Sequence, residues 1–449
     1  MMDWTRLLTP KRLGRDDQGG KAGHTSFERD FDRVLFSRPF RRLQDKTQVF
    51  PMPANDHVHN RMTHSLEVAS VGRSLGKRAG YVVLERHPEL ATYNPADLGD
   101  IVAAACLMHD LGNPPFGHAG EDAIGAWFRD ADARGALERL SGAQRSDLCH
   151  FEGNAQTFRI VAGLENHPGQ GGMQLTHATL AAVVKYPQPS SARKLRPGVV
   201  HKKFNYFEAE AALFAEVADA VGLAPVAEGV WRRHPLAWLV EAADDLCFHI
   251  LDAEDGYLLG LFGYEEIRDL FDPLAGGEPP SGLLGQGDER ASVGWLRAKA
   301  IGRLVDECVT AFGDHEAQLL GEGLPKPLAA LIPSAAALER VGERSRARCY
   351  KAPEVLRVEL AGYRVLGELL GLFVPAALAT DPDSRQKKVL DLLPNAVRAG
   401  VTPYARVLAV TDYVAGMTDG FAVRTYRELT GGALPEITGR HRGRMVVGG

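Results

Sequence analysis

The sequence predicts an all-α fold, and three observations support this prediction. Apolar residues recur at helical spacing through most of the chain, and no segment shows the strict alternation of a half-buried strand. The Gly- and Pro-rich stretch 273–294 has helical patterns on both sides, so it predicts a long loop inside one unit. The 449 residues, 45% of them apolar, are sufficient for a large core. We therefore expect a single helical domain over 26–430, between a flexible N-terminal arm (1–25) and a flexible C-terminal tail (431–449).

Net charge, cysteine content and hydropathy indicate which classes of protein this chain can belong to. A formal net charge of -5 is nearly neutral for this length, so broad electrostatic attraction to nucleic acid or membrane is not expected. The five cysteines are odd in number and scattered, which predicts free thiols in a reducing cytoplasm. No apolar run reaches transmembrane length, and the first residues lack the pattern of a signal peptide. We expect a cytoplasmic protein without a membrane partner.

The first clear helix is predicted over 61–79. Val68, Val71, Leu75 and Ala79 share one face, and His64 lies one turn before Val68 on that face. A lone histidine on an apolar face is more often a core residue than a ligand. His64 therefore needs support from the rest of the chain before it counts as a site residue.

That support comes from residues 101–121. The apolar run 101–108 predicts a buried helix, which places His109 and Asp110 at its end. Gly112 and the two prolines that follow predict a loop carrying His118 and Glu121. An imidazole beside a carboxylate against a core is costly to desolvate unless a partner compensates, and a metal ion is a common partner for that pair.

Further helices are expected over 207–221, 236–251, 354–378 and 405–429. On the second of these, Asp244 falls at the margin of the apolar stripe, whereas Asp245 points to the polar face and can be solvated. A basic loop precedes them; its residues are Arg193, Lys194, Arg196, His201, Lys202 and Lys203. It is either a solvated loop or a phosphate-attracting one. No Walker motif occurs, which excludes a P-loop NTPase.

Several motifs together resemble a known family. They are Arg41 to Pro51, Arg61 to Val68, His109 to His118, Glu152 to Gln156, Glu241 to Asp245 and Asp412 to Asp419. The chain from about Phe27 to Leu429 resembles the HD-domain deoxynucleoside triphosphate triphosphohydrolases, which include the bacterial dGTPases. The resemblance implies an HD-domain helical phosphohydrolase fold with an HD core over about 60–255 and additional C-terminal helices.

The resemblance also implies a site and an activity. The metal ligands would be His64, His109, Asp110 and Asp244, a mixed nitrogen and oxygen set that suits Mn²⁺ or Mg²⁺, with Fe²⁺ or Zn²⁺ as alternatives. The catalytic pair would be His118 and Glu121. The substrate contacts would be Gln48, Arg61, Lys185, Tyr186 and Asp252. The expected reaction is metal-dependent hydrolysis of deoxynucleoside triphosphates, dGTP among them, to deoxynucleoside and inorganic triphosphate.

Alternatives and partners remain open at this point. The chain could be an HD phosphohydrolase acting on another nucleotide, or a nucleic-acid-binding regulatory protein with a vestigial site. The family pattern implies a homo-oligomer, a tetramer or hexamer, and allows an allosteric dNTP or single-stranded DNA as an effector. Phe248 occupies a position that often carries Tyr in the family, so strict preference for dGTP is not carried over.

Overall fold

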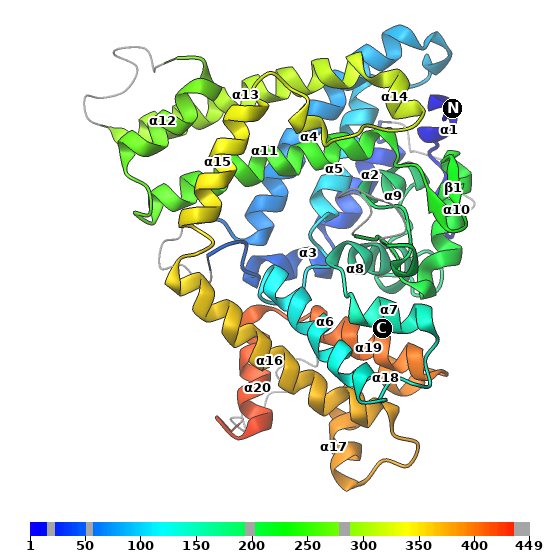
Figure 1. The fold of residues 1–449 in the computed structure, drawn as a ribbon. Coiled ribbons are helices and arrows are strands. Elements are labelled where there is room, and N and C mark those ends of the chain that lie inside the picture. Colours follow the sequence, from blue (N-terminus) through cyan, green and yellow to red (C-terminus); the bar gives the residue numbers. More distant parts are fainter. Residues whose placement is uncertain (16–22, 51–56, 194–202, 278–287, 435–449) are drawn as a thin grey trace.

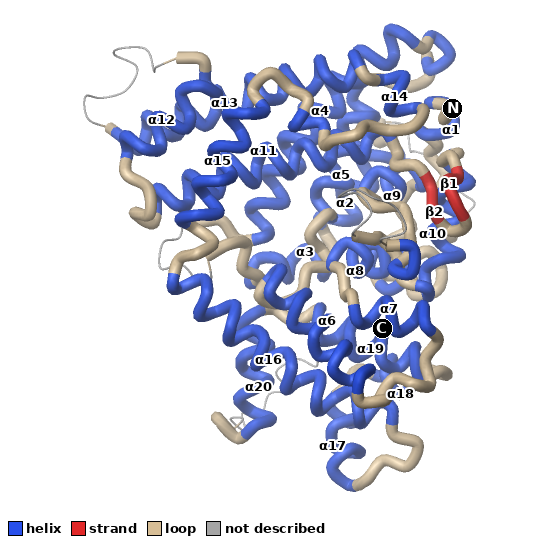
Figure 2. Tube along the Cα trace, in the orientation of Figure 1, coloured by secondary structure: helices blue, strands red, loops and turns tan. Residues whose placement is uncertain are grey.

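The computed structural model describes residues 1–15, 23–50, 57–193, 203–277 and 288–434. In these ranges the regular secondary structure is helical apart from one two-stranded antiparallel sheet, in which β1 (Pro225–Ala227) pairs with β2 (Val230–Trp231). Figure 2 shows how small that sheet is beside the helices. The predicted all-α fold is confirmed.

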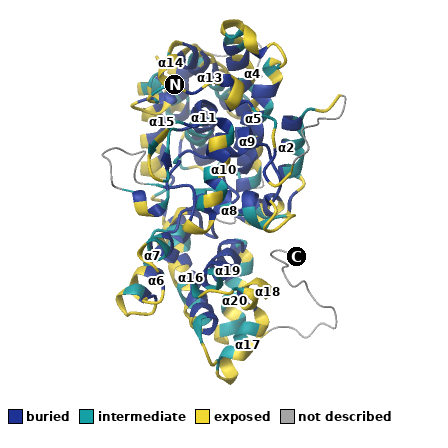
Figure 3. Cartoon of the chain, turned by 90° about the vertical axis from the view of Figure 1, so that its right-hand side faces the viewer, coloured by how far each residue is buried: buried dark blue, intermediate teal, exposed yellow. Residues whose placement is uncertain are grey.

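The helices divide between two lobes, which Figure 1 shows one above the other. The first lobe contains α1 (Trp4–Leu7), α2 (Ser26–Leu35), α3 (Arg38–Arg42), α4 (Arg61–Arg86), α5 (Pro95–Met108), α8 (Gly153–Arg159), α9 (His177–Val183), α10 (Ala211–Val221), α11 (Pro235–Leu258), α12 (Tyr264–Ala275), α13 (Glu289–Asp314), α14 (Glu316–Leu320) and α15 (Ala335–Arg348). The second contains α6 (Gly117–Ala133), α7 (Gly142–Cys149), α16 (Pro353–Leu378), α17 (Ser384–Leu392), α18 (Asn395–Ala399), α19 (Pro403–Ala415) and α20 (Asp419–Thr430). The side view in Figure 3 shows buried residues inside both lobes, in agreement with two separate apolar cores.

The centre of the first lobe is the pair α4 and α5. Gly72 and Gly76 of α4 let the two backbones approach, because a Cβ at Gly76 would lie 2.6 Å from the carbonyl oxygen of Leu98 on α5. Asn60 caps the N-terminus of helix α4, because its side chain accepts a 3.0 Å hydrogen bond from the Thr63 amide. Helix α11 packs on both α4 and α5. This three-helix arrangement brings the predicted ligands from distant parts of the sequence to one place.

The predicted N-terminal arm is wrong over the described residues 1–15. Trp4, Leu7, Leu8 and Leu13 are buried in the first core, and the Trp4 indole donates a 2.8 Å hydrogen bond to Glu316. Apolar residues at positions 4, 7 and 8 have helical spacing, and they outweigh the polar, basic character of the segment. Residues 16–22, and the part of the predicted tail from 435 onward, lie outside the described residues.

Several element boundaries differ from the prediction. The helix expected over 405–429 is two helices, α19 and α20, because Gly416 ends the first and Thr418 caps the second. Helices α4 and α11 each run seven residues beyond their predicted ends. The loop predicted over 273–294 is shorter, since α12 continues through Pro273 and α13 begins at Glu289; residues 278–287 lie outside the described residues.

Among the described helices, α16 alone has the length and apolar composition of a membrane span. Half of its most apolar window is buried, and it packs against α6 and α19 inside the second lobe. Core helices of folded domains commonly have this composition.

Candidate active site

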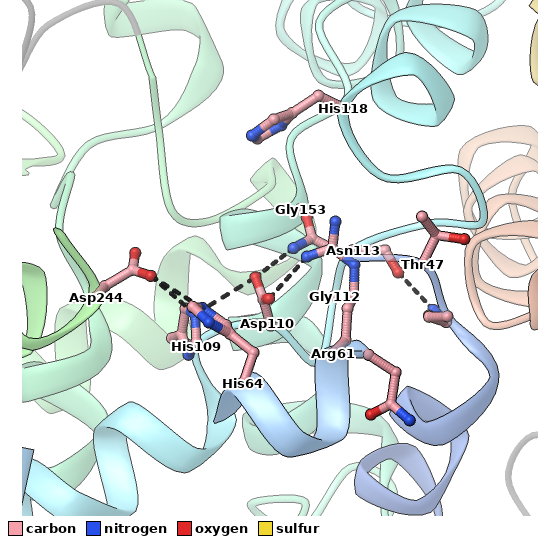
Figure 4. A network of polar contacts seen from close by, with 12 residues as sticks. Thr47, Arg61, His64, His109, Asp110, Gly112, Asn113, His118, Gly153 and Asp244 are labelled. Atoms are coloured by element: carbon pink, nitrogen blue, oxygen red, sulfur yellow. Dashed lines mark hydrogen bonds and ion pairs between the residues drawn. The ribbon is translucent and has the colours of Figure 1, made fainter. Parts of the chain in front are cut away.

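Three of the four predicted metal ligands form a compact group in the first lobe. His64 lies on α4, His109 immediately follows α5, and Asp244 lies on α11. The Asp244 Oδ1 atom is 3.3 Å from His64 Nε2 and 3.4 Å from His109 Nε2, as Figure 4 shows. One ligand atom from each residue lies within 4.8 Å of the others, which suits a shared ion.

The imidazole of His109 is set up to be a ligand. Its Nδ1 lies 2.6 Å from the carbonyl oxygen of Cys106, so that nitrogen carries the proton and Nε2 keeps its lone pair. The Nε2 atom is buried, and none of the residues that the structure describes forms a hydrogen bond with it. Because buried polar atoms are nearly always satisfied, an unbonded nitrogen facing two other ligand atoms indicates a site for a cation. The residues present therefore fit a divalent metal ion.

Asp110 lies beside this group, and its carboxylate is held by two neighbours. Its Oδ2 accepts a 2.7 Å hydrogen bond from Arg61, and its Oδ1 accepts one from Asn113. The same Oδ1 is 3.6 Å from His109 Nε2. Burial alone would raise the pKa of Asp110, but its neighbours His109, Arg61 and His64 together hold it below its usual range. Asp110 therefore stays ionised next to the other three predicted ligands.

Lys185 donates a hydrogen bond to one member of the candidate ligand group of His64, His109 and Asp244. Its ammonium donates a 2.8 Å hydrogen bond to Asp244 Oδ2, on the side of the carboxylate away from the histidines. Burial alone would raise the pKa of Asp244, but Lys185 and His109 hold it well below its usual value. Asp244 thus stays charged at any pH near neutral.

His118 and Glu121 form the predicted pair, although not in a loop. Both lie on the first two turns of α6, because the helix resumes at Gly117, sooner after the two prolines than expected. The His118 Nδ1 atom is 2.9 Å from Glu121, whose other oxygen accepts a 2.7 Å hydrogen bond from the Gly153 amide. The hydrogen bond to Glu121 raises the pKa of His118. Figure 4 shows His118 apart from the metal group, and about three quarters of its side-chain surface is exposed.

All these side chains line one cavity of about 260 Å³. Its walls are Gln48, Arg61, His64, His109, Asp110, Asn113, His118, Glu121, Asn154, Lys185, Tyr186, Lys203, Glu241, Asp244, Asp245, Phe248 and Tyr350. Every predicted site residue is present except Asp252. The cavity is highly polar and lies where the two lobes meet, with α6 of the second lobe facing α4, α5 and α11 of the first.

Asp252 does not line the cavity, so its assignment as a direct substrate contact is corrected. It is buried behind the wall, where it accepts a hydrogen bond from the Tyr350 hydroxyl. Tyr350 itself faces the cavity, with its ring 5.9 Å from that of Phe248. The phenol that the sequence lacks at position 248 is therefore present nearby, supplied by the connection between α15 and α16. No sequence signal links Tyr350 to residues a hundred positions away.

The expectation for Asp245 also needs correction. Asp245 is not freely solvated, because it is half-buried in the cavity wall. Burial, reinforced by the carboxylates of Glu241 and Asp244, raises the pKa of Asp245 to about 8. Of the two aspartates, Asp244 is the one that lies in the group with His64 and His109, on the side of the helix expected for a ligand.

Lys203 is the described end of the predicted basic loop, and it lines the cavity. Its ammonium donates a 3.1 Å hydrogen bond to Glu152, a buried residue of the motif that precedes α8. Burial alone would lower the pKa of Lys203, but Glu152 and Glu121 raise it, so Lys203 stays charged. Arg193 is described but does not line the cavity, and residues 194–202 of the loop lie outside the described residues.

Comparisons with known proteins agree with this geometry. The HD domain model matches residues 61–155, which include His64, the His109-Asp110 pair and His118, and the phosphohydrolase-associated domain model matches residues 337–428. The chain is 42% identical to a deoxyguanosinetriphosphate triphosphohydrolase-like protein of Pseudomonas aeruginosa, over 97% of this chain and all of that protein. It is also 42% identical to a protein of the same name from Synechocystis sp., over 96% of this chain and all of that protein.

A more distant relative has the name without the suffix. The deoxyguanosinetriphosphate triphosphohydrolase of Salmonella paratyphi A is 30% identical over 95% of this chain and 98% of that protein. The chain thus matches both family models and is similar to these relatives over nearly its full length. The chain therefore belongs to the deoxyguanosinetriphosphate triphosphohydrolase-like family of HD-domain phosphohydrolases.

Proposed function

We propose that the protein hydrolyses deoxynucleoside triphosphates, dGTP among them, to deoxynucleoside and inorganic triphosphate with the help of a divalent metal ion. The observation that carries the proposal is the unbonded His109 Nε2, which faces His64 and Asp244 in a cavity that also holds the His118–Glu121 pair. The names of the relatives support the choice of substrate.

The ion would be held by His64, His109 and Asp244, with Asp110 beside them. Nitrogen and carboxylate ligands suit Mn²⁺, Fe²⁺ and Zn²⁺, and Mg²⁺ when water completes its shell; we favour Mn²⁺ or Mg²⁺. When bound, such an ion polarises a phosphoryl oxygen and lowers the pKa of a water molecule.

The cations of the cavity suit a triphosphate. Arg61, Lys185 and Lys203 all line it, and each is paired with a carboxylate: Asp110, Asp244 and Glu152, respectively. A polyphosphate entering the cavity can share these donors, since each guanidinium or ammonium has further N–H groups. The cations orient the phosphates and offset their charge, which is the main work of an enzyme in phosphoryl transfer.

His118 is the proton donor in this proposal. Attack at the α-phosphorus releases the 5′ oxygen of the nucleoside, which needs a proton as it departs. Glu121 raises the pKa of His118, so the imidazole is more often protonated near neutral pH than an isolated histidine. Glu121 is itself fixed by the Gly153 amide, which keeps the pair in one orientation.

We assign discrimination between deoxyribose and ribose to Gln48, which lines the cavity. Its Oε1 atom is buried in the wall and has no hydrogen-bond partner among the described residues. Phe248 and Tyr350 supply aromatic surface in the same cavity. We propose that Gln48 and its neighbours leave room for a deoxyribose and crowd a ribose 2′-hydroxyl.

Gln48→Ala is therefore expected to raise the ratio of kcat/KM for GTP over dGTP by about tenfold, because the smaller side chain makes room for a hydroxyl. Steady-state rates with both nucleotides measure this ratio. Gln44→Ala, an exposed glutamine four residues earlier, is the matched control and should leave it unchanged. An unchanged ratio in Gln48→Ala would remove Gln48 from the sugar site.

A panel of nucleotides with each metal in turn tests the function. The purified protein is incubated with the four dNTPs, the four NTPs and a dNDP, with Mn²⁺, Mg²⁺, Fe²⁺ or Zn²⁺, and products are separated by chromatography. The expected result is deoxynucleoside from dNTPs, with chelator abolishing turnover. Turnover of a different nucleotide class alone would favour the alternative of an HD phosphohydrolase with another substrate.

A further inference from the structure

The associated domain, residues 337–428, contributes one carboxylate to the organisation of the active site. Asp419 is the first residue of α20, is buried, and does not line the catalytic cavity. Its Oδ1 accepts a 3.0 Å hydrogen bond from the Phe116 amide. Its Oδ2 accepts hydrogen bonds from the Thr47 amide, at 3.0 Å, and the Thr47 hydroxyl, at 2.5 Å. Asp419 thus joins two segments that each lead into the cavity.

The first of these segments is the HD loop, residues 111–116, which ends where α6 begins. Phe116 has a φ of 65°, a left-handed conformation that is unfavourable for a bulky residue and persists only when its surroundings hold it. Phe116 is also the N-cap of α6, and its side chain provides no capping hydrogen bond. The bond to Asp419 fixes this residue two positions before His118.

The associated domain also holds the Phe116 ring. Gly362 of α16 lies against the ring so closely that a Cβ there would be 2.9 Å from the Phe116 Cδ2 atom. Both the amide and the ring of Phe116 are therefore placed by residues of the associated domain.

The second segment carries Gln48. Thr47 precedes it directly, and Lys46 before that donates hydrogen bonds to the carbonyl oxygens of Asn113 in the HD loop and Ala415 at the end of α19. Asp419 and Lys46 therefore connect the same three segments by independent hydrogen bonds: residues 46–48, the HD loop and the associated domain. The spacing between the wall that bears Gln48 and the helix that bears His118 is fixed by these contacts.

We propose that Asp419 is a positioning residue for the reaction: by binding Phe116 and Thr47 it holds the first turn of α6, and so His118 and Glu121, in register with the substrate. In this proposal the associated domain fixes the position of the active-site residues on α6. This inference rests on the proposed function, and hydrogen exchange tests its structural part separately.

Asp419→Asn tests the inference in the full-length, metal-loaded protein. The amide keeps the size of the side chain but has only one oxygen to accept two sets of hydrogen bonds. A small displacement of the proton donor slows chemistry strongly, so kcat should fall by about 10²-fold, while KM and metal content stay close to wild type. Gly362→Ala should lower kcat in the same way, because its methyl group displaces the Phe116 ring.

Asp412→Asn is the matched control. Asp412 is another buried carboxylate of the associated domain. It accepts hydrogen bonds from the first lobe, from Arg159 at 2.8 Å and Gln156 at 2.9 Å, and these bonds do not involve the HD loop. Its loss should lower the unfolding temperature with little change in kcat. If Asp412→Asn and Asp419→Asn reduced kcat equally, Asp419 would be a structural residue and the proposal would be overturned.

A double-mutant cycle separates positioning from general destabilisation. If Asp419 acts through His118, then His118→Ala should cost much less activity in the Asp419→Asn background than in the wild type. In the Asp412→Asn background the effect of His118→Ala should remain complete. Additive losses for Asp419 and His118 would overturn the proposal.

Hydrogen exchange gives a readout that does not depend on the substrate. The Phe116 amide should be protected in the wild type and in Asp412→Asn, and should exchange much faster in Asp419→Asn. If the wild type hydrolyses no dNTP, the proposed function fails while this test still decides whether Asp419 holds the loop. Equal protection of the Phe116 amide in all three proteins would overturn the inference.

Discussion

Asp244→Ala is expected to lose the bound metal ion and dNTP hydrolysis together. Asp244 supplies a carboxylate oxygen that lies within reach of both His64 and His109, and its removal also takes away the carboxylate that Lys185 bonds to. A metal ion contributes several kcal/mol of transition-state stabilisation, so the rate should fall by about 10³-fold or more. Asp244→Asn, which preserves the shape of the side chain, should lose metal and activity in the same way. It replaces the alanine variant in the test if that variant folds poorly.

Asp245→Ala is the control for this prediction. Asp245 is adjacent in sequence and lines the same cavity, but it lies outside the ligand group. It should retain most of its metal. Elemental analysis of both purified variants after loading with Mn²⁺ measures this. Loss of the ion from Asp245→Ala, with retention in Asp244→Ala, would reverse the assignment of the two residues.

His118→Ala is expected to lower kcat by about 10² to 10⁴-fold, the usual range for a general acid, while metal content stays unchanged. The side chain lies apart from the ligand group and is mostly exposed, so its removal leaves no buried ligand atom unpaired. Metal analysis and single-turnover rates on the same preparation separate the two effects. Loss of metal together with activity would show that His118 is a ligand.

The pH dependence follows from the hydrogen bond between His118 and Glu121. His118 must be protonated to act as the acid, so activity should decline as pH rises through its pKa, which Glu121 raises above the ordinary value. The Glu121→Gln variant lacks this carboxylate, so the pKa of His118 should fall. The alkaline limb of the kcat profile should then move to lower pH. A limb that stays in place would mean that another group sets it.

Much of the fold was predictable because apolar spacing is a local property. The buried helix before His109 and the stripe that includes His64 follow from it, and both are confirmed as α5 and α4. The helix ends were less predictable, as in the division of 405–429 at Gly416, where a single glycine competes with a continuing apolar pattern. Trp4 shows the reverse case, since a short apolar cluster inside a basic segment is buried because distant parts of the fold pack against it.

The site was predictable where its chemistry lies in short motifs. The His109-Asp110 pair and the His118–Glu121 pair each lie within a few residues of sequence, whereas His64 and Asp244, on two other helices, were joined to them only by the resemblance to the family. Tyr350 and Asp419 were not predictable in this way, because they reach the site only through the packing of α15, α16 and α20 against the first lobe. Asp252 was misplaced for the same reason, since Tyr350 takes the position that faces the cavity.

Hydrolysis of a dNTP in water enriched in ¹⁸O tests most directly which bond breaks. If water attacks the α-phosphorus and the 5′ oxygen departs, mass spectrometry should find the label in inorganic triphosphate and none in the deoxynucleoside. Release of pyrophosphate with a nucleoside monophosphate, or of orthophosphate with a diphosphate, would contradict the triphosphohydrolase account.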